Sequence, residues 1–256
     1  TLVADGAKPE FPSNPSSCDG TSTTFVGWTP TPWSGKLDDV SAQTIYTSGS
    51  AMPDVSGPVT YHAVFADEGT TFTKVTDPSV FVAGDKIAIV SNNNSYGLRI
   101  SSNAPAATAN TISDAATITP AADQVFTLAG NSTDGFTMST ASRTSEGTVT
   151  LGAASVPNSN SSANVILSSS NNTWKFSAHN TSNCILISLS SKSTCGLEYY
   201  KSSWKIYNNS GVASNAACAM RVYRKNLSGY VTTCSECMTP SDLEVSAITS
   251  TGATVT

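Results

Sequence analysis

The sequence is short of charge, of histidine and of basic clusters. Only 12% of its 256 residues are Asp, Glu, Lys or Arg, about half the usual share, and the formal net charge is -5 at pH 7. Nucleic-acid affinity depends on many cationic contacts to phosphates, so this charge balance argues against a nucleic-acid partner. No run of 18 apolar residues is present, and we therefore expect no transmembrane segment.

The two histidines and the acidic residues offer little for catalysis. A Ser-His-Asp hydrolase needs a histidine beside its nucleophile, yet His62 falls in a strand-like run and His179 in a turn. Most acidic residues, such as Asp54 and Asp85, lie in turns, where Asp bonds its own backbone. No Asp-x-Asp-x-Asp series suits a calcium loop. We expect no enzyme activity, no catalytic residue, no cofactor and no metal site.

What is present is a Ser/Thr/Asn-rich surface composition with 39% hydrophobic residues. Enough apolar and aromatic side chains lie along the chain to stabilise ordered domains, which argues against disorder. Such a composition is typical of extracellular β-proteins. Because no secretion signal opens the chain and its last residues resemble an interrupted strand, we expect a segment of a longer, exported precursor.

Six cysteines permit up to three disulfides without fixing their connectivity. Cys184 and Cys195 lie near neighbouring predicted strands and could form a cross-strand bridge, with buried free thiols as the alternative. Cys234-x-x-Cys237 lies in a polar linker and could be a disulfide, two free thiols or half of a zinc site. Zinc is disfavoured because no second ligand pair lies nearby.

The residue pattern predicts an all-β chain in three parts: residues 1–67, residues 70–225, and an incomplete third segment over residues 226–256. The middle part contains many short strand-like runs separated by Gly, Asn, Asp and Ser, which favours a β-barrel or a sandwich. A recurring strand–turn–strand pattern also suits the three lobes of a β-trefoil. The runs expected in residues 70–225 are 71–75, 86–90, 97–101, 117–119, 124–128, 135–139, 148–151, 164–168, 173–178, 184–189, 196–200, 203–207 and 217–223.

Three segments resemble known families. Thr24-Phe-Val-Gly-Trp28 and Thr60-Tyr-His-Ala-Val-Phe65 resemble the strands of the Listeria–Bacteroides repeat, the internalin-type B-repeat, which implies a small β-grasp-like fold for residues 1–67. Ala83-Gly-Asp-Lys-Ile-Ala-Ile-Val90 and Trp204-Lys-Ile-Tyr207 resemble parts of β-barrel modules in surface proteins of gut Bacteroides-type bacteria. The tail, residues 240–256, resembles the first two strands of a fibronectin type III domain, which implies the start of a β-sandwich.

Exposed aromatics are the best candidates for a binding surface, because pyranose rings stack on Tyr and Trp. Trp28, Trp174 and Trp204 alternate with apolar neighbours and suit a core. The candidate ligand-binding residues are Trp33, Tyr96, Tyr199 and Tyr200, with Tyr207 also considered.

These observations together predict a non-catalytic modular region of a bacterial protein, located outside the cell or on its outer surface. We expect a monomer that binds a glycan, or a protein on a host or cell surface, in adhesion. The alternatives are a carbohydrate-binding accessory region of a secreted hydrolase and a purely structural spacer.

Overall fold

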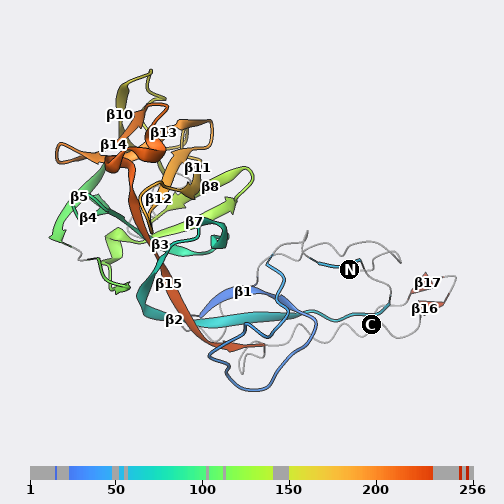
Figure 1. Cartoon of the computed structure of the whole chain (residues 1–256). Helices are drawn as coiled ribbons and strands as arrows, with labels where there is room; N and C mark the ends of the chain where they lie inside the picture. Colours follow the sequence, from blue (N-terminus) through green and yellow to red (C-terminus); the bar gives the residue numbers. More distant parts are fainter. Residues whose placement is uncertain are drawn as a thin grey trace. The chain divides into compact units, whose positions relative to one another are not determined.

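The computed structural model describes residues 15, 23–47, 52–54, 57–101, 104–111, 114–140, 150–232, 248–249 and 252–253. Within these residues every regular element is a β-strand or a short 3-10 turn (Figure 1), so the chain is all-β, as predicted. The chain divides into two compact units, one made of Thr1–Asp67 with Ser228–Thr256 and the other of Glu68–Leu227. No helix in the described part is long and apolar enough to cross a membrane.

The smaller unit contains an antiparallel pair of strands. Strand β1 (Thr23–Thr29) pairs with the first part of β2 (His62–Val75), with Phe25 opposite Phe65 and their rings 5.9 Å apart. These are the two strands that carry the resemblance to the B-repeat. Gly27 is required between the aromatic residues, because a Cβ there would stand 2.6 Å from the carbonyl oxygen of Tyr46.

Six strands of the larger unit form a closed ring. Each pairs antiparallel with the next, and the last pairs with the first, so none is left as a free edge. In ring order the strands are β3 (Lys86–Ser91), β7 (Phe126–Asn131), β8 (Gly135–Ser139), β11 (Trp174–Ala178), β12 (Ile185–Leu189) and β15 (Met220–Val231).

Each lobe of this unit consists of two ring strands (β3 and β7, β8 and β11, or β12 and β15) and a hairpin that lies between them in the chain. Three hairpins therefore complete the unit. They are β4 (Tyr96–Ser101) with β5 (Ala104–Thr111), β9 (Thr150–Ala153) with β10 (Ser161–Ser168), and β13 (Lys192–Tyr200) with β14 (Ser203–Asn208). The chain therefore repeats a four-strand lobe three times around a six-stranded barrel. This pairing pattern is that of a β-trefoil, the arrangement that the recurring strand pairs suggested.

One continuous core fills the barrel and the inner faces of the hairpins. Trp174 is fully buried in it, and its indole Nε1 donates a hydrogen bond of 2.7 Å to the carbonyl oxygen of Leu151. That bond ties the hairpin of the second lobe to the barrel. Gly135, at φ +109°, lets β8 pass close to β11, because a Cβ there would stand 3.0 Å from the carbonyl oxygen of Trp174.

The structure differs from the predicted division in two places. Ser228–Thr256 group with Thr1–Asp67 in one compact unit, and most of the predicted third part, residues 226–256, lies outside the described residues. The runs 60–65 and 71–75, which were expected in different parts, are one strand, β2. Of the tail that resembles a fibronectin domain, only β16 (Ile248–Thr249) and β17 (Gly252–Ala253) lie in the described residues, where they pair with each other.

Candidate functional site

The outer face of the β13–β14 hairpin collects polar and aromatic side chains. Glu198 lies opposite Lys205 and Tyr200 opposite Ser203, while β10 pairs along the other edge of β14 with Asn164 opposite Lys205. Paired residues on neighbouring strands share a face of the sheet, and faces alternate along each strand. Asn164, Glu198, Tyr200 and Lys205 therefore share the face that points away from the core, which we name the hairpin face.

Tyr200 is the most exposed large hydrophobic side chain in the described part of the chain, at 50%. It lies at the tip of the hairpin, directly before Lys201 and Ser202, whose φ angles are 49° and 61°. A two-residue turn of this kind normally uses Asn or Gly, since other residues lose roughly 1–2 kcal/mol each in a left-handed conformation. The Lys201 ammonium lies over the Tyr200 ring, 5.3 Å from its centroid.

A stack of aromatic rings supports the tip from the core side. The rings of Tyr199 and Trp204 have centroids 5.2 Å apart, and Tyr96 packs edge-on against Tyr199 at 5.0 Å. Tyr199 and Trp204 are both buried. Because a hairpin tip anchored by packed rings loses little further freedom when it binds a ligand, this support lowers the entropic cost of recognition.

Glu198 is the buried acidic group of the hairpin face, with only 4% of the residue exposed. Burial raises the pKa of its carboxyl group, and the opposing charge of Lys205 offsets part of this rise. Cys218, in the 3-10 turn Ala216–Cys218, lies beside the same strand, where its Sγ is 3.3 Å from the position of a Cβ on Gly196. Burial, with the Glu198 charge as a smaller cause, raises the pKa of Cys218 to about 12.

The hairpin face combines a ring surface with complementary hydrogen-bonding groups. Asn164, Lys205 and Glu198 form one row across three strands, spaced by about 5 Å, and Tyr200 lies two residues beyond Glu198, about 7 Å along its strand. An amide can donate and accept, an ammonium donates and a carboxylate accepts. Glu198 is buried, so Asn164 and Lys205 are the members of the row that can bind hydroxyl groups while the aromatic ring covers an apolar face of the same ligand.

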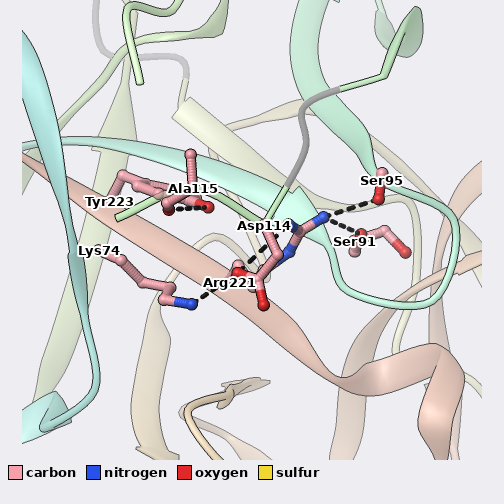
Figure 2. A network of polar contacts seen from close by, with 7 residues as sticks. All are labelled: Lys74, Ser91, Ser95, Asp114, Ala115, Arg221 and Tyr223. Carbon is pink, nitrogen blue, oxygen red and sulfur yellow. Dashed lines mark hydrogen bonds and ion pairs between the residues drawn. The ribbon is translucent and has the colours of Figure 1, made fainter. Parts of the chain in front are cut away.

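A second polar cluster surrounds Arg221, which is only 2% exposed (Figure 2). Its Nη2 donates a 2.9 Å hydrogen bond to Ser95 Oγ, and its Nη1 lies 3.5 Å from Asp114 Oδ1. Asp114 also binds the Lys74 ammonium at 2.5 Å. These contacts join β15, β2 and the turn between β3 and β4. Because the guanidinium is buried, the cluster serves to hold these segments together.

The structure separates the four predicted ligand-binding residues. Tyr200 lies on the hairpin face. Tyr199 points to the opposite face and is core, because adjacent residues of a strand alternate, and Tyr96 packs against it half-buried. Trp33 belongs to the smaller unit, where its Nε1 donates to the carbonyl oxygen of Tyr230 at 3.1 Å.

Sequence reasoning missed Asn164, Glu198 and Lys205 as site residues. The signal for two of them was available: a two-residue turn after Tyr200 pairs Glu198 with Lys205 and places both on the same face as that tyrosine. Asn164 could not be found this way, because β10 reaches β14 from a different lobe.

The predicted Cys184–Cys195 disulfide is absent, since both residues are buried free thiols, as is Cys218. Ser188 lies opposite Gly196, and the two strands are antiparallel, so the cysteines are offset by about five residues, or roughly 17 Å. A disulfide requires Cα atoms within about 7 Å. Cys234 and Cys237 lie outside the described residues.

The described histidines and acidic groups form no metal cluster: no group of three or more His, Cys, Asp or Glu side chains there could hold an ion. His179 is buried, its Nδ1 accepts a 2.9 Å hydrogen bond from the backbone N–H of Thr181, and its Nε2 contacts the carbonyl oxygen of Asn215 at 3.1 Å. This ring therefore joins two loops.

Comparisons with known proteins assign no family. No family model matches, and neither does any curated protein. Among solved structures, the chain is similar to the BEL β-trefoil, with 14% identity over 59% of this chain and all of that one, at a TM-score of 0.38. It is also similar to the lysenin pore, with 11% identity over 70% of this chain and 57% of that one, at 0.36. Likenesses of this size assign neither fold family nor function, and the trefoil assignment depends on the strand pairing alone.

Proposed function

We propose that the larger unit is a non-catalytic glycan-binding module whose site is the hairpin face. The observation that carries this proposal is Tyr200, a half-exposed aromatic ring on a strained turn, next to a row of hydrogen-bonding side chains. Left-handed residues other than glycine persist where the surrounding structure holds them, and they concentrate at functional sites.

The expected binding mode follows from the chemistry of sugars. A pyranose has an apolar face of C–H groups, which stacks on the Tyr200 ring, and hydroxyl groups at its rim. Lys205 would donate to a hydroxyl oxygen, while the Asn164 amide oxygen would accept from a hydroxyl group. The charge-assisted hydrogen bond from Lys205 would contribute more than a neutral one.

A glycan array probed with the purified chain tests this function. We expect binding to one class of polysaccharide, and Tyr200→Ala should weaken it by about tenfold or more, as for a central aromatic anchor. Tyr200→Phe is the matched control, because it keeps the ring and removes only the hydroxyl group. Both variants should melt like the parent, since Tyr200 lies outside the core. Equal binding by all three proteins would reject the hairpin face as the site.

The same array separates the rival functions. Binding restricted to one structural polysaccharide would favour an accessory region of a secreted hydrolase, whereas recognition of host glycans would favour adhesion. A chain that binds no glycan, and no protein from the corresponding surface, would be a spacer. We propose a monomer, and sedimentation of the purified chain tests this.

We also propose that the protein acts outside the bacterial cell or on its outer surface. The Ser/Thr/Asn-rich composition and the resemblance of β1 and β2 to B-repeat strands support this location. Labelling intact producing cells with a membrane-impermeant amine reagent tests it, because exposed lysines such as Lys36 and Lys201 would react without lysis.

A further inference from the structure

The second and third lobes carry a strong local excess of positive charge. The whole chain has a net charge of -5, yet residues 150–227 hold only one acidic residue, Glu198. The basic residues in this stretch number seven: Lys175, Lys192, Lys201, Lys205, Arg221, Arg224 and Lys225. An acidic protein therefore has a basic region that includes the hairpin face.

Three of these basic residues are already paired, because Arg221, Arg224 and Lys225 lie within ion-pair distance of Asp114, Asp85 and Glu68, respectively. These pairs belong to the contacts that join β15 to neighbouring segments.

The remaining four basic residues of this stretch, all lysines, differ from these three in having no acidic partner among the described residues. In the described part of the chain, no carboxylate oxygen lies within 4.0 Å of the ammonium group of Lys175, Lys192, Lys201 or Lys205. Lys201 and Lys205 flank Tyr200, one at the turn and one on the neighbouring strand. Lys205 lies opposite Glu198 in the strand register without forming an ion pair, so its ammonium group is available to a ligand.

We propose that the hairpin face binds an anionic sugar, a pyranose that bears a carboxylate or a sulfate group. The proposal rests on the glycan-binding function above and names its ligand class. The pyranose ring takes the place of the Lys201 ammonium over the Tyr200 ring, and its anionic group lies between the ammonium groups of Lys201 and Lys205. Charge complementarity carries this choice, because the accessible charges beside Tyr200 are both positive and the single carboxyl group is buried.

Chemically matched polysaccharides test the ligand class. Polygalacturonic acid is compared with its carboxyl-reduced form, and dextran sulfate with dextran, using the whole chain and its variants Lys205→Gln, Lys201→Gln and Lys175→Gln. The last is the matched control, an exposed lysine on β11 outside the hairpin face. We expect the anionic member of one pair to bind at least about tenfold more tightly than its neutral partner, and to weaken as salt rises. Lys205→Gln should weaken the binding of this anionic polysaccharide about fivefold to tenfold, and Lys175→Gln should weaken it less than twofold.

The outcomes distinguish the ligand class from the function itself. Preference within the first pair identifies a carboxylate, and preference within the second a sulfate. If neutral polymers bind as tightly as the charged ones, and Tyr200→Ala weakens that binding, the hairpin face remains a glycan site but the anionic ligand class is wrong. A different outcome is that both polyanions bind equally well, that Tyr200→Ala does not change this binding, and that all three lysine variants weaken it equally. This result would indicate diffuse charge attraction and would overturn the proposal. No binding to any polymer would reject the glycan-binding function.

Discussion

Substitution of Gly135 by alanine tests the closure of the barrel. Gly135 has φ +109°, and an added Cβ would stand 2.7 Å from Thr173 Cγ2 and 3.0 Å from the carbonyl oxygen of Trp174. The backbone strain of a non-glycine residue there costs about 1–2 kcal/mol. The methyl of Thr173 can rotate away, but the carbonyl belongs to a paired strand, and forcing it aside adds about 1–3 kcal/mol. We expect Gly135→Ala to destabilise the larger unit by about 2–5 kcal/mol.

Gly84→Ala is the matched control. Gly84 also has a positive φ, +92°, but nothing lies within 4 Å of its added Cβ. Gly84→Ala should therefore lower the free energy of unfolding only by the cost of the backbone strain, about 1–2 kcal/mol. Urea denaturation followed by tryptophan fluorescence measures both variants, with free energies of unfolding from linear extrapolation. If Gly135→Ala is no less stable than Gly84→Ala, then β8 does not pass β11 as closely as described.

Three further predictions concern buried groups. Trp174→Phe should lower the free energy of unfolding by about 1–3 kcal/mol, because the buried carbonyl of Leu151 loses its donor; a change below about 0.5 kcal/mol in urea denaturation would contradict that bond. Burial raises the pKa of Glu198 above 4.5, so its stabilising contribution is present below pH 4.5 and is lost as the pH rises through the folded-state value. Glu198→Gln should therefore have a higher free energy of unfolding than the parent at pH 7, and this difference should disappear toward pH 4. A difference that grows on acidification would refute the raised pKa of Glu198. Cys195 and Cys218 should resist iodoacetamide at pH 8 in the native protein and react in guanidinium, as peptide mapping would show, because both thiols are buried and the pKa of Cys218 is about 12. Rapid native labelling of either cysteine would contradict this.

Much of the barrel could be predicted from the sequence, because its strands are short apolar runs separated by turn residues. Runs such as Lys86–Ser91 and Trp174–Ala178 fall where the pattern placed them. Strand β5 was missed, since Ala-Pro-Ala-Ala-Thr-Ala-Asn-Thr has no alternation to detect. The grouping of Ser228–Thr256 with the first unit was also missed, because it depends on pairing between residues nearly 200 positions apart.

The candidate site was predicted only at Tyr200. An aromatic pair such as Tyr199-Tyr200 must send one ring to each face of a strand, and the sequence alone does not say which is buried. Tyr199 takes the inner face because it packs between Tyr96 and Trp204. The contribution of Asn164 required knowing that two different lobes share a sheet.

The trefoil unit enters and leaves through neighbouring strands, with Asn226 hydrogen-bonded to both Thr71 and Thr73. It is therefore an insertion within the smaller unit, whose two segments are joined by bonds such as that between Trp33 and Thr232. During synthesis the ribosome must release the entire trefoil before these partners can meet. The N-terminal segment can therefore complete its contacts with residues such as Thr232 only after the whole trefoil has been synthesised.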